Sequence, residues 1–251
     1  MKAMIFAAGL GTRLRPLTND LPKALIKIKD VTLLELTIKK LNYYGFNEII
    51  INIHHWADKI IDFLQVNKNF GLNIVISDES DLLLDTGGGL KKTAWFFNDN
   101  QPFLIHNVDI ISDINLKELY QNHLKSSALV TLAVSKRQTS RYFLFDKENN
   151  LAGWQNLKTN EEKISTKNKE TKNQLTPLAF SGIQVINPQV FSFMPEEKIF
   201  SITDFYLTLA ENHQIKYFDH TGSNWLDVGK LENIKTAEEM MMRMEHESMK
   251  T

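Results

Sequence analysis

The stretch Ala8-Gly9-Leu10-Gly11-Thr12-Arg13-Leu14-Arg15-Pro16-Leu17-Thr18-Asn19-Asp20-Leu21-Pro22-Lys23 joins a glycine turn to three cations. It follows the apolar run 3–7, which is short enough to be a buried strand. The two glycines let the backbone turn sharply and come close to a ligand, and successive N–H groups in such a turn form a concavity that suits a phosphate. The stretch therefore predicts a site that grips a polyphosphate.

The spacing of this stretch excludes two common phosphate loops. A Walker loop needs Gly-Lys followed by Ser or Thr, and the dinucleotide fingerprint needs a third glycine where this chain has Leu14. The run Gly-x-Gly-Thr-Arg, with Pro-Lys ending at Lys23, resembles instead the sugar-1-phosphate nucleotidyltransferase family. Members of that family join an NTP to a sugar 1-phosphate and release pyrophosphate. The alternative is a plain strand-to-loop turn without a ligand.

Composition narrows the class of protein. The chain has 251 residues, of which 43% are hydrophobic, so it can bury a sizeable core. Lys and Arg number 29 against 30 Asp and Glu, which argues against nucleic acid as a partner. Cysteine is absent, which excludes disulfides and zinc–thiolate sites. No run approaches a membrane span, so we expect a soluble cytoplasmic protein without a membrane partner, either a monomer or a homodimer.

Apolar runs alternate with helical patterns along the chain. The runs 48–53 and 72–76 read as buried strands, the patterns 32–45 and 56–64 read as helices, and Thr32 and Glu35 have capping-box spacing. This alternation predicts an α/β fold with a Rossmann-like, mostly parallel central sheet and helices on both faces. We expect one domain, 1–251, with a nucleotide-binding half (1–135), a sugar-binding half with a small extra β region (136–230) and a C-terminal helix (231–251). The polar stretch 156–174 is expected to be a mobile loop.

Three consecutive glycines mark a second ligand-binding candidate. Residues 90–97 look helical, so the triplet would lie near a helix N-terminus, which favours anions. In the family that the chain resembles, a glycine-rich loop at this place contacts base, ribose or sugar. The alternative is a flexible loop.

Two acids are candidates for a metal site. Asp109 follows an apolar strand, and ligands of open parallel sheets bind beyond the carboxyl ends of strands. The resemblance implies that Asp109 binds a metal, although Val108 stands where the family usually has Gly. Asp227 lies in Trp-Leu-Asp-Val-Gly, which resembles the family's Trp-x-Asp-x-Gly and its second metal ligand. Mg²⁺ suits two carboxylates and phosphate oxygens. The alternative for Asp109 is a turn or cap residue.

The resemblance assigns roles to further residues. Arg13 and Lys23 would hold the NTP phosphates and act in catalysis. The acceptor-binding Glu-Lys-Pro of many relatives is replaced by other residues near 154–158, so the cation that holds the sugar phosphate stays open. The expected nucleotide-binding residues are Ala8, Gly9, Gly11, Thr12, Glu79, Thr86, Gly87 and Gly88. The expected sugar-phosphate-binding residues are Asn107, Arg141, Lys158, Ser181 and Gly182.

Within the family, the compact form with the triple glycine resembles N-acetylmuramate-1-phosphate uridylyltransferases of cell-wall recycling. It is also similar to mannose-1-phosphate guanylyltransferases, and a carboxylate at Glu79 would suit guanine. Two other classes stay open: a non-catalytic nucleotide-sugar sensor on the same fold, and a cytidylyltransferase acting on a small alcohol phosphate. His54 and His55 are adjacent, so in a strand they would point to opposite faces, and we expect them to be structural.

Overall fold

The computed structural model describes residues 1–168 and 172–248, without the side chains of 244–248, and it divides into two compact units. The first unit consists of Met1–Leu83, His106–Asn115 and Ser223–Thr251. The second consists of Leu84–Ile105 and Leu116–Gly222. Each unit is therefore assembled from segments that are far apart in the sequence.

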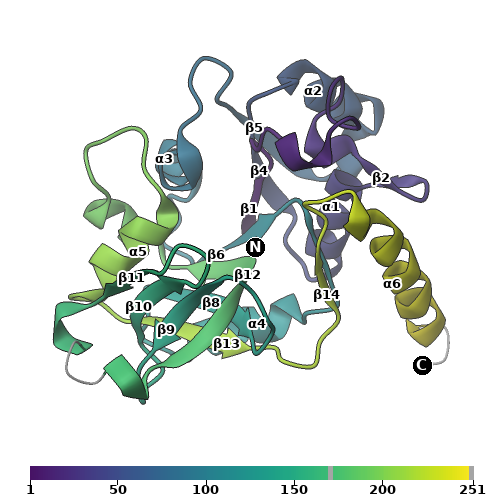
Figure 1. Cartoon of the computed structure of the whole chain (residues 1–251). Helices are drawn as coiled ribbons and strands as arrows, with labels where there is room; N and C mark the ends of the chain where they lie inside the picture. The colour runs from purple at the N-terminus through teal and green to yellow at the C-terminus, as the bar shows by residue number, and fades with distance from the viewer. Residues whose placement is uncertain (169–171, 249–251) are drawn as a thin grey trace. The chain divides into compact units, whose positions relative to one another are not determined.

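The first unit contains the parallel sheet that the sequence predicts (Figure 1). Strand β1 (Lys2–Phe6) pairs in parallel with β4 (Glu48–Ile53), and β4 pairs in parallel with β5 (Asn73–Asp78). Helices α1 (Leu33–Tyr43) and α2 (Ala57–Val66) connect these strands along the chain. The backbone N–H of Glu35 donates to the Thr32 hydroxyl over 3.1 Å, which confirms the predicted start of α1.

The remaining elements of the first unit carry or support the candidate site. Strand β7 (Ile110–Ser112) pairs antiparallel with β14 (Trp225–Asp227), and β2 (Lys27–Ile28) pairs with β3 (Val31–Thr32). The helix α6 (Glu232–Ser248) lies within the predicted C-terminal helix 231–251, of which residues 249–251 lie outside the described part. The described residues of the unit also form the 3₁₀ turns η1 (Thr12–Leu14), η2 (Lys23–Leu25) and η3 (Lys68–Gly71).

The second unit is built on a largely antiparallel sheet. Its strands follow the order β11-β10-β9-β12; β8 also pairs with β12, and β13 pairs in parallel with β8. The strands are β8 (Val130–Ser135), β9 (Arg141–Phe145), β10 (Leu151–Asn156), β11 (Glu161–Ile164), β12 (Thr176–Ile186) and β13 (Ile215–Asp219). The helices are α3 (Asp85–Lys92), α4 (Leu116–Leu124) and α5 (Ile202–Ala210), with 3₁₀ turns η4 (Ala94–Phe96), η5 (Thr166–Asn168), η6 (Lys172–Gln174) and η7 (Pro188–Phe193).

The fold is thus α/β with a mixed central sheet and helices, as predicted. Strand β6 (Phe103–Asn107) contributes its first three residues to the second unit and its last two to the first. Buried branched side chains fill β4, where Ile49, Ile50, Ile51 and Ile53 are fully buried. No helix in the described parts of the chain is long and apolar enough to cross a membrane.

Two local expectations were wrong. The glycine triplet was expected to precede a helix that starts at residue 90, but α3 begins at Asp85 and contains all three glycines. The stretch 156–174 was expected to be a loop, but Gln155 and Glu162 pair across β10 and β11, and short 3₁₀ turns follow. Its residues 169–171 lie outside the described part.

The reason for the first error is close packing within the second unit. The N–H groups of Gly87 and Gly88 both donate to the carbonyl of Phe200, over 2.9 and 3.3 Å. A Cβ on Gly88 would lie 2.0 Å from the Lys198 carbonyl oxygen, and one on Gly87 would lie 2.4 Å from the Phe200 ring. These glycines are therefore required by backbone approach inside the protein, a demand that looks the same in sequence as approach to a ligand.

Candidate active site

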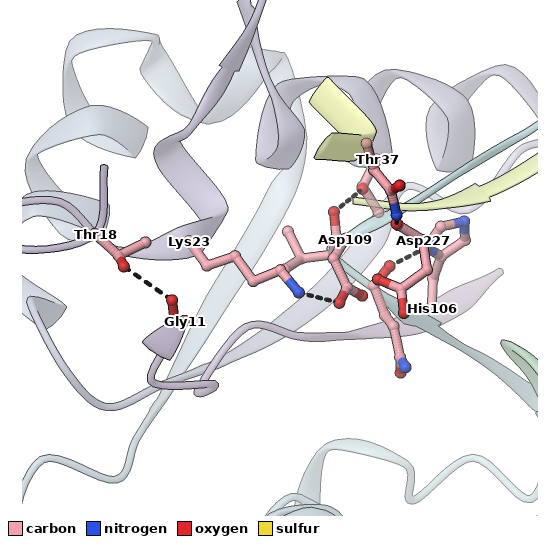
Figure 2. Close-up of polar contacts among 10 residues, drawn as sticks. Gly11, Thr18, Lys23, Thr37, His106, Asp109 and Asp227 are labelled. Atoms are coloured by element: carbon pink, nitrogen blue, oxygen red, sulfur yellow. Dashed lines mark hydrogen bonds and ion pairs between the residues drawn. The ribbon is translucent and has the colours of Figure 1, made fainter. Parts of the chain in front are cut away.

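The glycine turn after β1 has the shape that the sequence predicts. Gly11 has φ +64°, and a Cβ there would lie 2.9 Å from Thr18 Cγ2. The Thr18 hydroxyl donates to the Gly11 carbonyl over 2.8 Å and closes the loop, as Figure 2 shows. Glycine is therefore needed at position 11 both for its left-handed backbone and for the space that Thr18 occupies.

The turn forms one wall of a cavity of about 360 Å³ in the first unit. Two cations and one acid line it together with backbone of the glycine turn. The lining residues are Gly9, Leu10, Gly11, Thr12, Arg13, Lys23, Asp109 and Gly229. The structure thus brings together five of the predicted nucleotide-binding and catalytic residues with a predicted metal ligand.

Lys23 points at Asp109 inside this cavity (Figure 2). Its ammonium group forms an ion pair with Asp109 Oδ2, and the lysine is 9% exposed. Lys23 opens the turn η2 directly after Pro22, whose fixed φ limits the directions that the chain can take. A cation held this way beside a carboxylate suits a site where phosphate and metal charges meet.

The second acid is delivered to the same place by strand pairing. Asp227, the last residue of β14, is in register with Ile110 of β7, which directly follows Asp109. The N–H of Val228 donates to the Asp109 carbonyl over 2.8 Å, and the Asn233 side chain donates to the Asp227 carbonyl over 2.7 Å. The two carboxylates, far apart in sequence, are therefore fixed side by side by backbone contacts.

The electrostatics of the pair fit a divalent cation. Burial raises the pKa of Asp227, the adjacent Asp109 raises it further, and Lys23 and Arg13 oppose the shift. Asp227 Oδ1 is buried and has no hydrogen-bond partner among the described residues. Within those residues no group of three or more His, Asp or Glu could hold a metal. A Mg²⁺ ion at Asp109 and Asp227 would therefore complete its shell with phosphate oxygens and water, as this ion commonly does.

Glu79, which the sequence analysis expected to bind nucleotide, is buried within the protein. Its carboxylate is 1% exposed and accepts from the Asn52 side chain over 2.8 Å. Asn52 also accepts from the N–H of Ala7, over 2.9 Å, at the end of β1. Glu79 thus supports the strand end that leads into the glycine turn, and its contact with a base stays a prediction. His54 Nδ1 donates to the Glu79 carbonyl over 2.6 Å, in line with a structural role.

Of the other predicted nucleotide-binding residues, Thr86, Gly87 and Gly88 lie in the second unit and Ala8 lies in the first. The Thr86 hydroxyl accepts from the N–H of Ile202 over 3.0 Å, and the amides of Gly87 and Gly88 bind Phe200 as described above. These groups are engaged within their own unit. Ala8, in the first unit, is 7% exposed beside the glycine turn. Contacts of all four residues with nucleotide stay predictions.

The predicted sugar-phosphate residues are divided between buried and exposed positions. Ser181 is fully buried, and its hydroxyl lies 2.6 Å from His220 Nε2; the adjacent Gly182 has φ +73°. Arg141 at the start of β9 and Lys158 after β10 are exposed. The carbonyl of Asn107, at the end of β6, accepts from His106 Nδ1 over 2.8 Å. Their contact with a sugar phosphate stays a prediction.

Gly229 is the site residue that sequence reasoning passed over. A Cβ on it would lie 2.6 Å from Asp227 Oδ1 and 3.1 Å from Arg13 Nη2. The sequence does mark this position, because Gly229 is the glycine of the Trp-x-Asp-x-Gly pattern. Its small size leaves room for the acid and the cation, a reason that the pattern alone does not give.

Comparison with known proteins identifies the family. The family model described as "Nucleotidyl transferase" matches residues 2–243, almost the whole chain. The chain belongs to the nucleotidyl transferase family. The residues predicted for catalysis and metal binding all lie in the first unit of this nucleotidyl transferase. They are Arg13, Lys23, Asp109 and Asp227.

Curated relatives of this nucleotidyl transferase differ in the substrates that their names give. A UTP–glucose-1-phosphate uridylyltransferase of Synechocystis is 28% identical over 92% of this chain, which spans 61% of that relative. An N-acetylmuramate α-1-phosphate uridylyltransferase of Neisseria meningitidis is 29% identical, over 95% of this chain and 97% of the relative. A mannose-1-phosphate guanyltransferase of Saccharomyces cerevisiae is 28% identical, over 92% of the chain and 62% of the relative.

Solved structures of similar fold agree with the sheet and helices described above. The structure of a "putative glucose-1-phosphate thymidylyltransferase" from Bacillus anthracis superposes with a TM-score of 0.77 at 18% identity. The superposition covers 96% of this chain and 94% of the Bacillus anthracis chain. At this identity the likeness establishes the fold, and the substrates have to be argued from the site.

Proposed function

We propose that this nucleotidyl transferase joins an NTP to a sugar 1-phosphate and releases pyrophosphate. The observation that carries the proposal is the convergence of Arg13, Lys23 and Asp109 on one glycine-lined cavity, with Asp227 beside Asp109. A protein that merely bound nucleotide would have no need of two carboxylates held side by side at a phosphate site. The sensor hypothesis is therefore weaker than the enzyme hypothesis.

For this reaction the protein has mainly to position the two reactants and to stabilise their negative charge. An oxygen of the sugar 1-phosphate, already ionised at neutral pH, attacks the α-phosphorus of the NTP. A new P–O bond forms there, and the bond to the β-phosphate oxygen breaks with its electron pair on pyrophosphate. Both reactants are anions, so repulsion and the extra charge on phosphorus are the obstacles.

The residues of the cavity address those obstacles. The N–H groups of the glycine turn would bind phosphate oxygens, and Arg13 and Lys23 would offset the charge that develops on pyrophosphate. Asp109 and Asp227 would hold Mg²⁺, which supplies Lewis-acid stabilisation of the α-phosphoryl oxygens when bound. With Asp109 engaged as a metal ligand, Lys23 would be available to bind a phosphate oxygen in place of that carboxylate.

For the substrates we propose UTP and N-acetylmuramate 1-phosphate, hence a role in cell-wall recycling in the cytoplasm. Support comes from the Neisseria relative, which matches this chain over nearly the full length of both. GTP with mannose 1-phosphate is the second candidate, because several relatives carry that name. The burial of Glu79 against Asn52 weakens the residue-level argument for guanine.

A pyrophosphate-release assay tests the proposal. It crosses UTP, GTP, CTP, dTTP and ATP with the 1-phosphates of N-acetylmuramate, mannose, glucose and N-acetylglucosamine, with Mg²⁺ or EDTA. We expect one Mg²⁺-dependent pair to dominate and Asp227→Asn to lose it. Asp62→Asn, at an exposed acid of α2, is the matched control. No turnover across the grid, with nucleotide binding intact by calorimetry, would favour the sensor.

A further inference from the structure

We infer that helix α1 fixes the two acids of the active site, with Lys40 and Thr37 as positioning residues for the Asp109–Asp227 pair. The inference rests on the proposed function of that pair. Neither Lys40 nor Thr37 lines the cavity; both act through the backbone on either side of Asp109.

The contacts bracket Asp109 along the chain. The Thr37 hydroxyl lies 2.9 Å from the Leu33 carbonyl and 3.4 Å from the carbonyl of Val108, which directly precedes the acid. The ammonium group of Lys40 donates to the carbonyl and hydroxyl of Ser112, over 2.6 and 2.7 Å. Residues three apart share one face of a helix, so a single face of α1 holds both sides of the acid. Figure 2 shows Thr37 beside Asp109.

The same anchor reaches the second acid through strand pairing. Ser112, which Lys40 binds, is in register with Trp225, and Ile110 is in register with Asp227. A shift of β7 would therefore move β14, and with it both carboxylates. Some residues do not bind the metal but hold its ligands in position. Removing such a residue commonly weakens metal binding by about 10- to 100-fold.

Stability alone is a poor reason for a lysine at this position. Burial lowers the pKa of Lys40 to about 7, against a smaller opposing effect of Asp113. An apolar side chain would fill the same space without the cost of burying an ammonium group. What the lysine adds is two directed hydrogen bonds to one residue of β7, which fix the position of that strand in a way that apolar contact would not.

The experiment measures metal binding directly. Mn²⁺ binding to the full chain is titrated by electron paramagnetic resonance, with and without UTP, for Lys40→Met, Thr37→Val and Ser112→Ala. Lys39→Met is the matched control, because Lys39 is the neighbouring exposed lysine and pairs with Glu35 on the helix surface. We expect Lys40→Met to weaken Mn²⁺ binding about tenfold, Lys40→Arg to restore part of the affinity, and Lys39→Met to match the wild type.

Each outcome decides between alternatives. A folded Lys40→Met protein with wild-type Mn²⁺ affinity would overturn the inference, even if its Tm were lower. If Lys40→Met does not fold, Thr37→Val and Ser112→Ala decide: weaker Mn²⁺ binding by either one supports the inference, and unchanged affinity in both refutes it. Asp227→Asn tests the proposed metal site separately from the positioning role of Lys40 and Thr37. Unchanged Mn²⁺ binding in that variant would refute the metal site itself.

Discussion

The ammonium group of Lys23 forms an ion pair with the carboxylate of Asp109 inside the glycine-lined cavity. The two residues come from turn η2 and from the loop after β6, so the fold itself brings the cation and the acid together. Either residue removed alone leaves the other with an unbalanced charge in a largely buried place. This relationship makes Lys23 the most informative residue to change.

Substitution of Lys23 by Met should lower kcat about 10²- to 10³-fold, because the charge proposed to develop on pyrophosphate would lose one of the two cations that line the cavity. The KM for NTP should change much less than kcat. Steady-state kinetics at saturating Mg²⁺ measures both values, and Lys27→Met, at an exposed lysine of β2, is the control. A Lys23→Met enzyme with turnover near that of the wild type would show that the role is wrongly assigned.

Substitution of Gly229 by Ala should damage activity more than stability. The new Cβ would meet the ends of two side chains, Asp227 Oδ1 at 2.6 Å and Arg13 Nη2 at 3.1 Å, and both can move aside. Their movement would displace the proposed metal ligand Asp227 and the proposed phosphate-binding Arg13. We expect kcat to fall at least tenfold with a Tm near that of the wild type, measured by kinetics and thermal unfolding. A large loss of Tm with unchanged kcat would contradict this reasoning.

Substitution of Gly88 by Ala should lower stability more than activity. Alanine in an unobstructed helix stabilises relative to glycine by up to about 1 kcal/mol. Here the Cβ would lie 2.0 Å from the Lys198 carbonyl, which is backbone and cannot give way cheaply. We expect a loss of about 3 kcal/mol in the free energy of unfolding.

Urea unfolding measures this loss. The control is Gly9→Ala, since a Cβ on Gly9 has no neighbour within 4 Å among the atoms of the described residues. If Gly88→Ala were as stable as the wild type, α3 and the segment at Lys198 would not pack as described.

Stability should fall in mild acid because of His123. Burial lowers the pKa of this imidazole to about 4, and its Nδ1 lies 2.9 Å from the Thr131 hydroxyl. The unfolded chain, with a histidine pKa near about 6.5, therefore binds the proton first as the pH falls. The contribution of His123 is complete above about pH 6.5 and is lost between about pH 6.5 and 4.

The full effect is about 3 kcal/mol in the free energy of unfolding. Urea unfolding at several pH values compares the wild type with His123→Gln, which should lack this part of the pH dependence. His55→Gln, at an exposed histidine, should retain it. Parallel pH curves for the wild type and His123→Gln would rule out the mechanism.

Local chemistry explains which features could be predicted from sequence. The glycine turn, the capping box at Thr32 and the strands of the first unit follow from short-range patterns, and each was confirmed. The pairing of Asp227 with Asp109 was anticipated through resemblance to a family, because no local pattern links segments so far apart.

The misses have a common physical cause. Gly87 and Gly88 are small because backbone of residues 198–200 lies against them, and Glu79 is buried because Asn52 reaches it. Lys40 looks like any helix-surface lysine in sequence, yet its ammonium group binds Ser112. All of these depend on tertiary neighbours, which a pattern of residue types does not contain.

The interleaved segments of the first unit affect how the enzyme is made. Domains generally fold as units during synthesis, starting from the N-terminus, but this unit needs β14, which follows Gly222. A nascent chain that already contains the glycine turn therefore still lacks Asp227. A chain that ends before β14 would lack Asp227, and with it one member of the Asp109–Asp227 pair.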